Sequence, residues 1–86
     1  MEIIVRKPTQ SEIEFMQKQP IWEKEISTFP YSYDQQEMCL ILEGDVEVTH
    51  KDGSAKFGPG DLVIFPEGLS CNWNIKKAVR KHYKFG

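Results

Sequence analysis

The sequence predicts an all-β domain, a small antiparallel β-barrel or jelly roll with one short helix near the N-terminus. The first observation is residues 58 to 73, where two corners rich in glycine and proline enclose the apolar run Leu62-Val63-Ile64-Phe65. Proline fixes φ and glycine accepts the left-handed angles of sharp corners. A short run that is apolar on both faces indicates a strand covered on both sides. The second observation is the aromatic share, 12% of the residues, which suits a protein built of strands.

The chain is long enough for one domain, residues 1–86. Hydrophobic residues make up 40% of it, which is enough for a core. A domain of this size buries only about 60–65% of its unfolded surface and is marginally stable alone. We therefore expect a second copy to stabilise it as a homodimer.

Charge and composition exclude several classes of protein. The net charge is −2 with both signs mixed along the chain, whereas nucleic-acid binding needs a basic face. No apolar run approaches the roughly 20 residues of a membrane span, and the N-terminus lacks a signal-peptide pattern. Two cysteines cannot form a disulfide-rich framework. The sequence thus predicts a reduced, cytoplasmic protein that binds neither nucleic acid nor membrane.

The N-terminal segment predicts a short strand followed by a short helix. Ile3-Ile4-Val5 is β-branched and precedes Pro8, and Thr9-Gln10-Ser11-Glu12 fits a capping box. Ile13 and Met16 lie three residues apart and give the helix one apolar side before Pro20 ends it. We expect this helix to be a lid or a flank of the domain rather than part of its core.

The next segment predicts a strand, a turn and a second extended stretch. Trp22 to Ile26 alternates in part between apolar and charged residues, which favours a strand. Phe29-Pro30 is expected to turn the chain. If Tyr31-Ser32-Tyr33 is extended, both tyrosines lie on one side.

The strand predicted at 37–42 carries an unusual residue. Glu37 shares one face with Cys39 and Ile41, so a carboxylate lies among apolar neighbours, while Met38, Leu40 and Leu42 form the other face. Gly44-Asp45 is expected to make a corner, after which Val46 and Val48 point inward.

The C-terminal half predicts a hairpin and two more strands. Asp52-Gly53 is the preferred sequence of a type I′ turn, and Ala55 and Phe57 return on the inner side. Beyond the central stretch, Cys71, Trp73 and Ile75 share one face of a strand. In the last strand, 79–85, the side chains alternate strongly between two faces. One face carries Val79, Lys81, Tyr83 and Phe85, and the other carries Arg80, His82 and Lys84.

Two spacings resemble the conserved motifs of the cupin family. The series Gly60-x5-Pro66-x-Gly68-x2-Cys71 resembles the second cupin motif, and Tyr31-x-Tyr33-x3-Glu37-x6-Gly44 resembles the first. The resemblance covers about residues 31–75 and implies a small antiparallel barrel, often dimeric, with a ligand pocket inside. Trp22-Glu23-Lys24 and Arg80-Lys81-His82-Tyr83 make the chain similar to single-domain cupins related to ureidoglycine aminohydrolase.

The same resemblance bears on metal binding. It implies that metal-dependent relatives carry histidines where this chain has Tyr31, Tyr33 and Cys71, so that Glu37 alone remains of the usual ligands. Neutral tyrosine is a poor ligand, and a divalent site needs three or four good donors. We therefore expect no standard metal site and no firm cofactor. A divalent metal held by Glu37, Cys71 and His82 stays open as an alternative.

Each candidate site residue also has a purely structural interpretation. Glu37 is either a satisfied buried carboxylate or, since perturbed carboxylates mark sites, a functional acid. Cys71 is either a core thiol or a nucleophile that needs a nearby base. Tyr31, Tyr33 and Trp73 either pack in the core or line a pocket for substrate.

His82 is either a surface residue or a catalytic partner of Glu37.

Three functions follow from these alternatives. The first is a small-molecule-binding protein, in which a carboxylate ringed by aromatic residues suits a small polar ligand with an amine or hydroxyls. The second is an enzyme of nitrogen or carbohydrate metabolism, aminohydrolase-like or isomerase-like, that uses Glu37 with Cys71 or His82. The third is a structural or interaction module.

Overall fold

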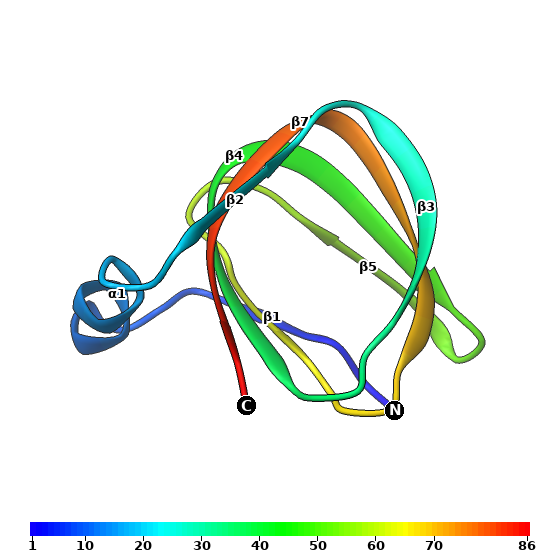
Figure 1. Cartoon of the computed structure of the whole chain (residues 1–86), viewed down its shortest axis with the longest axis horizontal. Helices are drawn as coiled ribbons and strands as arrows, with labels where there is room; N and C mark the ends of the chain where they lie inside the picture. The colour runs from blue at the N-terminus through cyan, green and yellow to red at the C-terminus, as the bar shows by residue number, and fades with distance from the viewer.

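The strands wind into a rolled antiparallel sheet that surrounds the main core, with the single helix outside it (Figure 1). The computed structural model describes all 86 residues. This arrangement confirms the predicted antiparallel all-β fold with one N-terminal helix. The elements are β1 Ile4–Arg6, α1 Gln10–Met16, β2 Ile21–Lys24, β3 Ser27–Ser32, β4 Glu37–His50, β5 Gly53–Phe57, β6 Leu62–Phe65 and β7 Ser70–Phe85.

Strands β4 and β7 form the spine of the sheet. They pair antiparallel along nearly their whole length, from Glu37 opposite Phe85 to Thr49 opposite Asn72. The other strands flank this pair at its two ends. At one end β6 joins β4, β1 joins β6, and β2 joins β7; at the other end β5 joins β4 and β3 joins β7. One long curved ribbon can therefore close around the main core.

The core fills the inner faces that the alternation of the sequence predicts. Val46 and Val48 are fully buried on β4, and Cys71, Trp73 and Ile75 are buried on β7. The intervening Glu47, Asn72 and Asn74 are more exposed, as the period of two requires.

The apolar run of β6 is covered on both sides, as predicted. Val63 and Phe65 belong to the main core, whereas Leu62 packs on the opposite face in a second cluster with Met16 and Leu40.

Helix α1 covers that second cluster. The predicted capping box is present: the Thr9 hydroxyl accepts a hydrogen bond from the Glu12 amide at 3.2 Å, and the Glu12 carboxylate accepts one from the Thr9 amide at 2.8 Å. Met16 has no exposed surface, so the helix completes a small core of its own and is more than the flank that we expected. The protein contains no helix that could span a lipid bilayer.

Two predicted breaks in the chain are wrong. Phe29-Pro30 does not turn the chain but lies within β3, where Pro30 is opposite Asn72. Because β3 pairs only with β7, it is an edge strand, and an edge strand tolerates a residue without an amide hydrogen. The two strands expected on either side of residues 76–78 are likewise one continuous strand, β7.

The corner predicted at Gly44-Asp45 is instead an irregularity inside β4. The pairing of β4 with β7 shifts register on both sides of Gly44, which has φ +123°. A Cβ atom at this position would lie 2.9 Å from Val79 Cα. Glycine is therefore required both by the backbone angle and by the close approach of β7.

The β4–β5 hairpin is present, but its turn is not of the predicted type. His50 pairs with Gly53, so Lys51 and Asp52 form the connection. No residue other than glycine has a positive φ, whereas a type I′ turn needs a positive φ at both central residues. Gly53 itself supplies the positive angle, +150°, at the start of β5.

Candidate functional site

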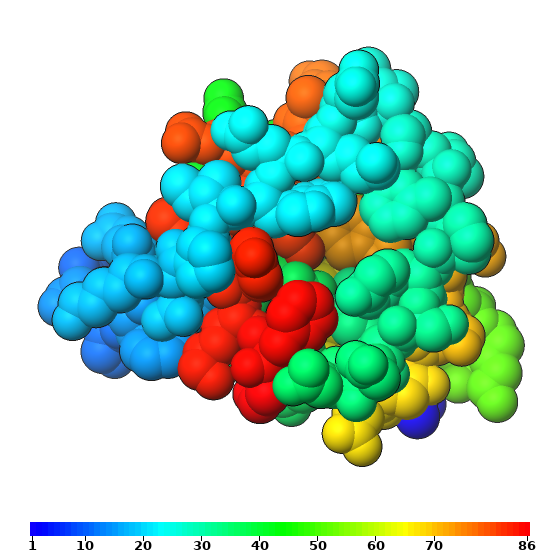
Figure 2. Space-filling view, viewed as in Figure 1, coloured from blue at the N-terminus to red at the C-terminus, as the bar shows by residue number.

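The inside of the barrel holds a cavity of about 210 Å³ at one end. Figure 2 shows the surface hollowed there, between β2, β3 and the C-terminal end of β7. The cavity is mainly aromatic, and its nine lining residues are Trp22, Phe29, Tyr31, Tyr33, Glu37, Trp73, Lys81, Tyr83 and Phe85. Strands from both ends of the chain thus build one site.

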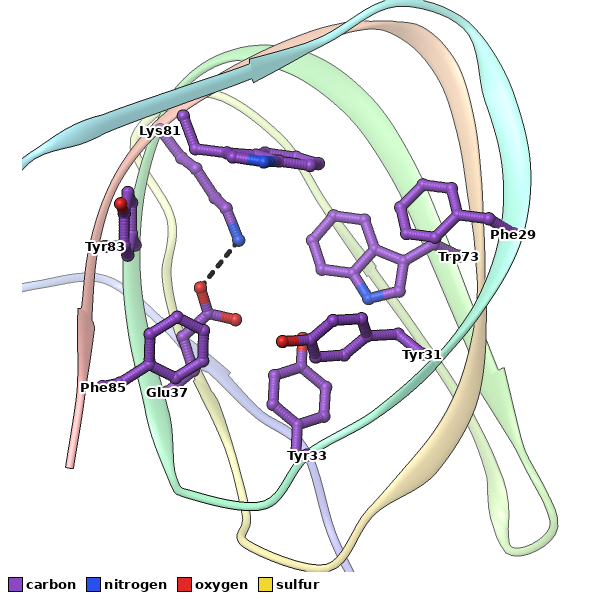
Figure 3. A pocket seen from close by; sticks show the side chains of 9 residues that line it. Phe29, Tyr31, Tyr33, Glu37, Trp73, Lys81, Tyr83 and Phe85 are labelled. Carbon is purple, nitrogen blue, oxygen red and sulfur yellow. Dashed lines mark hydrogen bonds and ion pairs between the residues drawn. The ribbon is translucent and has the colours of Figure 1, made fainter.

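A buried ion pair lies in this cavity. The Lys81 ammonium donates a hydrogen bond to Glu37 Oε2 at 2.9 Å, and the side chains are only 5% and 4% exposed. Glu37 is the first residue of β4, and Lys81 lies opposite Ile41 on β7. The lysine side chain therefore extends along the inner face of the sheet, past Cys39, to reach the carboxylate (Figure 3).

Aromatic rings and a thiol surround the ammonium. Lys81 Nζ lies 4.9 Å from the ring centroid of Trp22 and 4.8 Å from that of Trp73. The two indoles meet edge to face, with centroids 6.0 Å apart. Nζ also donates to Cys39 Sγ at 3.3 Å. Because aromatic faces attract cations, and more strongly when water is excluded, the rings and Glu37 together stabilise the charged form of Lys81.

The ionisation states follow from these contacts. Burial is the largest influence on the pKa of Lys81 and lowers it, but the charge of the Glu37 carboxylate and the hydrogen bonds to Glu37 and Cys39 oppose burial and hold this pKa above its ordinary value. Burial raises the pKa of the Cys39 thiol, so the thiol is neutral at neutral pH. The carboxylate is therefore the anion that balances the ammonium.

Two tyrosines form the wall opposite the ion pair. The rings of Tyr31 and Tyr33 meet edge to face with centroids 4.6 Å apart, as expected if both point to one side of an extended segment. Tyr33 stacks on Phe65 and is buried, while Tyr31 is 40% exposed at the rim. Burial raises the pKa of both phenols, and the Glu37 charge adds to the effect. Both hydroxyls are therefore protonated, and both point into the cavity (Figure 3).

Trp73 carries a buried donor without a partner. Its side chain stacks on Phe29, with ring centroids 5.9 Å apart, and is almost completely buried. Nε1 has no hydrogen-bond partner within the protein. An unpaired buried donor costs free energy, and this one lies in the wall of the cavity (Figure 3).

The structure brings four of the six candidate residues to the cavity, namely Glu37, Tyr31, Tyr33 and Trp73. Cys71 does not line it: the thiol packs in the main core and donates to the Tyr31 carbonyl at 3.5 Å. Burial, followed by the charge of Glu37, raises the pKa of Cys71. The sulfur next to the carboxylate is that of Cys39, which the sequence predicts only as part of an apolar face.

His82 points to the outer face of β7. Its Nδ1 lies 2.9 Å from the carbonyl oxygen of Gln19, in the segment that joins α1 to β2. It is 8% exposed and does not line the cavity. Because it alternates with Lys81 along the strand, it cannot reach Glu37 on the inner face.

Sequence reasoning missed Lys81 as a site residue. The sequence placed it on the same face of the last strand as Val79, Tyr83 and Phe85, and a lysine on an apolar face was the available signal. Glu37 gave the matching signal on its own strand. A lone lysine and a lone glutamate on two inner faces predict a buried pair, because an unpaired buried charge is too costly.

The donors present do not fit a divalent metal ion. The two tyrosines keep their protons, and Lys81 already neutralises Glu37. Cys71 and His82, the other donors that the sequence offered, do not line the cavity. No group of three or more histidine, cysteine, aspartate or glutamate side chains lies together in the protein, whereas divalent sites use three or four such ligands.

Comparisons with known proteins agree with this fold. The family model described as "EutQ-like cupin domain" matches residues 12–83. The crystal structure at 1.83 Å of a DUF861 family protein from Thermotoga maritima is 48% identical in sequence. It covers 99% of this chain and 100% of its own, with a TM-score of 0.93.

Two further solved structures are similar over a smaller share of their length. A putative ethanolamine utilization protein Q from Salmonella typhimurium is 25% identical, with a TM-score of 0.69, over 76% of this chain and 53% of its own. The EutQ protein of Clostridium difficile is 17% identical, with a TM-score of 0.70, over 76% of this chain and 52% of its own. Comparison with curated proteins gives no match.

Proposed function

The chain belongs to the EutQ-like cupin domain family, and from that premise we propose that it binds a small polar molecule in the cavity of its barrel. The observation that carries the proposal is the buried pair of Glu37 and Lys81 in an otherwise aromatic cavity. Apolar walls with a few converging polar groups are typical of small-molecule sites. A volume of about 210 Å³ lies below the range of roughly 300–1,000 Å³ for drug-sized ligands, so we expect a small metabolite.

Unused hydrogen-bonding capacity supports the proposal. The Trp73 indole N–H has no partner, and Lys81 is the only protein group that hydrogen-bonds the Glu37 carboxylate. The nearest candidate partner of the Trp73 N–H is the Tyr33 hydroxyl, whose pKa burial raises and the approach of the indole lowers, but the two groups make no hydrogen bond of ordinary geometry. Buried polar groups are nearly always satisfied in native proteins, and a bound polar molecule would satisfy several of these at once.

Tryptophan fluorescence gives a direct test, because the chain has two tryptophans and both line the cavity. Amino acids, ureides and sugars would be screened by thermal shift and then titrated against the emission of Trp22 and Trp73. A ligand at one hundred times its Kd adds about 2.7 kcal/mol to the stability of the native state.

The control for this screen is Glu37→Gln, which keeps the shape of the side chain and removes its charge. We expect this variant to lose the thermal shift and the fluorescence change for any true ligand. The proposal is wrong if the hits bind Glu37→Gln as tightly as wild type, or if no compound alters the fluorescence.

Catalysis is the second candidate function, as an enzyme of nitrogen or carbohydrate metabolism related to ureidoglycine aminohydrolase. What favours it is the adjacency of Glu37, a base, and the Lys81 ammonium, an acid, in one cavity. Release of ammonia from ureides and isomerisation of sugars would be assayed with wild type, Glu37→Gln and Cys71→Ala. Turnover that survives Glu37→Gln argues against this role, and turnover that Cys71→Ala abolishes would restore the thiol to the mechanism.

We also propose that the protein is a cytoplasmic homodimer. Both cysteines are free thiols, which suits a reducing compartment. Several large apolar side chains are exposed on α1 and near β2, including Phe15, Ile21 and Ile26. Sedimentation should give twice the 10.0 kDa mass of the chain; a monomer at high concentration would refute the dimer and leave a structural or interaction role unsupported.

A further inference from the structure

The position in the cavity that would attract an organic cation is already filled by the protein itself. A carboxylate beside two indole faces is the usual recognition site for an amine or ammonium group. Here the Lys81 ammonium lies 4.9 and 4.8 Å from the centroids of Trp22 and Trp73 and 2.9 Å from Glu37 Oε2. A ligand amine would have to displace a side chain that is covalently held in place.

The cavity is also electrically neutral. Glu37 and Lys81 are its only charged residues at neutral pH, and their charges cancel. A charged ligand head would therefore lie among aromatic rings with no free counter-charge, and burying an unpaired charge is strongly unfavourable. A neutral head group does not incur the cost of burying an unpaired charge.

The ion pair can still donate one hydrogen bond to a ligand and accept one hydrogen bond from it. An ammonium has three N–H donors, and Lys81 uses two of them, on Glu37 Oε2 and Cys39 Sγ. The second oxygen of Glu37 receives no hydrogen bond from the protein. Figure 3 shows that the ammonium and the carboxylate oxygen without a dashed line both face the space between the aromatic rings.

We infer that the cavity selects neutral, flat molecules whose polar edge carries a hydrogen-bond acceptor next to a donor, as in a primary carboxamide, and rejects their anionic and cationic counterparts. The carbonyl oxygen accepts from Lys81 Nζ, the amide N–H₂ donates to the free oxygen of Glu37, and the flat body lies against the aromatic walls. This inference rests on the proposed function and narrows it from polar molecules in general to one class. It replaces the amine-bearing ligand that the sequence suggested.

Three planar compounds of nearly the same shape separate the possibilities. Benzamide has an acceptor and a donor, benzoate has acceptors only, and benzamidinium has donors only. Wild-type protein would be titrated with each at neutral pH and constant ionic strength, with tryptophan emission as the signal. The indole N–H resonances of Trp22 and Trp73 in a ¹⁵N-labelled sample would show that binding occurs in the cavity.

We expect benzamide to bind at least about tenfold more tightly than either ion, because only the ions bring an unpaired charge. Benzoate or benzamidinium binding as tightly as benzamide overturns the inference, and so does the absence of any indole shift with all three. If the wider screen then yields a charged ligand that depends on Glu37, the proposed function stands and only the ligand class is wrong.

A variant should reverse the selectivity. Lys81→Ala empties the space between the indoles and leaves Glu37 uncompensated, so benzamidinium should become the tightest of the three. Lys77→Ala, an exposed lysine of the same strand, is the matched control and should keep the preference for benzamide. Unchanged selectivity in a folded Lys81→Ala protein contradicts the inference.

If Lys81→Ala does not fold, the double variant Glu37→Gln with Lys81→Met takes its place. It removes the Lys81 N–H that the amide oxygen would accept from, so benzamide should bind clearly more weakly than to wild type, while the two ions stay disfavoured because the cavity is still neutral. Unchanged benzamide affinity in this variant contradicts the inference. The comparison in the wild-type protein decides the matter without any variant.

Discussion

Removal of the Lys81 ammonium is the substitution that tests the buried ion pair most sharply. In Lys81→Met the new side chain keeps the length and the apolar stem of lysine, so packing against Trp22 and Trp73 is largely retained. What changes is that the Glu37 carboxylate, 4% exposed, loses its only protein hydrogen-bond donor. The effect on stability therefore reports on the charge and little else.

The expected cost follows from the burial of both groups. Breaking a buried pair by removing one partner destabilises by about 3–5 kcal/mol, since a buried charge is left uncompensated. A small domain has only about 5–15 kcal/mol in total, so the variant should be close to its limit. The double variant Glu37→Gln with Lys81→Met carries neither charge and should lie within about 2 kcal/mol of wild type, because neutral replacements of a buried pair are tolerated.

Urea unfolding at low temperature, followed by tryptophan emission, would measure all four proteins of this cycle. We expect the double variant to be markedly more stable than Lys81→Met alone, which corresponds to a coupling energy of several kcal/mol between Glu37 and Lys81. A cost below about 1 kcal/mol for Lys81→Met, or strictly additive effects in the double variant, would show that the two groups are exposed to water in solution and would refute the geometry described above.

Three further predictions concern the scaffold and its thiols. Gly44→Ala should cost about 2–4 kcal/mol, because it adds a positive-φ penalty to a 2.9 Å contact with Val79; Gly53→Ala has open space around it and should cost clearly less, and equal costs in urea unfolding would disprove the contact. Stability should fall as pH rises above about 8.5, where an unfolded thiol ionises. Folding raises the pKa of Cys39, so the native state holds a proton that the unfolded state loses, at about 1.4 kcal/mol per pH unit. Cys39→Ala should make the decline shallower by that amount, and an unchanged slope would refute the shift. Iodoacetamide at neutral pH should label Cys71 slowly, because it is buried and its pKa is raised; labelling at the rate of a free thiol would contradict this.

Local features of the fold were predictable because each depends on neighbouring residues. The capping box at Thr9, the doubly covered strand β6 and the inward face of Val46 and Val48 all follow from patterns within a few residues. The physical cause of each pattern lies within the same few residues, and it is either a satisfied backbone amide or a side-chain period of two.

Features that depend on distant contacts were not predictable. Gly44-Asp45 has the composition of a corner, and it becomes a bulge in β4 only because β7 lies alongside it. Pro30 has the signature of a turn, and it is tolerated in a strand only because β3 lies at an edge. The local sequence around Gly44 or Pro30 does not indicate which strands lie beside that segment.

The candidate site also combines residues that the local sequence indicates with one residue whose role depends on a distant contact. The motif spacing located Glu37, Tyr31 and Tyr33, and the alternation of the following strand added Trp73; all four line one cavity. Lys81 was not predicted as a site residue, because its neighbours Arg80 and His82 give the segment the composition of a solvent-exposed charged surface. The alternation of the strand separated these residues onto two faces, but the pairing with Glu37 needed the register between β4 and β7.

A crystal structure of the protein soaked with benzamide would test the central claim most directly, namely that a neutral ion pair in an aromatic cavity binds a polar molecule. We expect the amide oxygen within hydrogen-bond distance of Lys81 Nζ, the amide nitrogen beside the free oxygen of Glu37, and the salt bridge intact. An empty cavity at saturating benzamide, or a Lys81 side chain turned out to solvent with Glu37 bound to another group, would contradict the account.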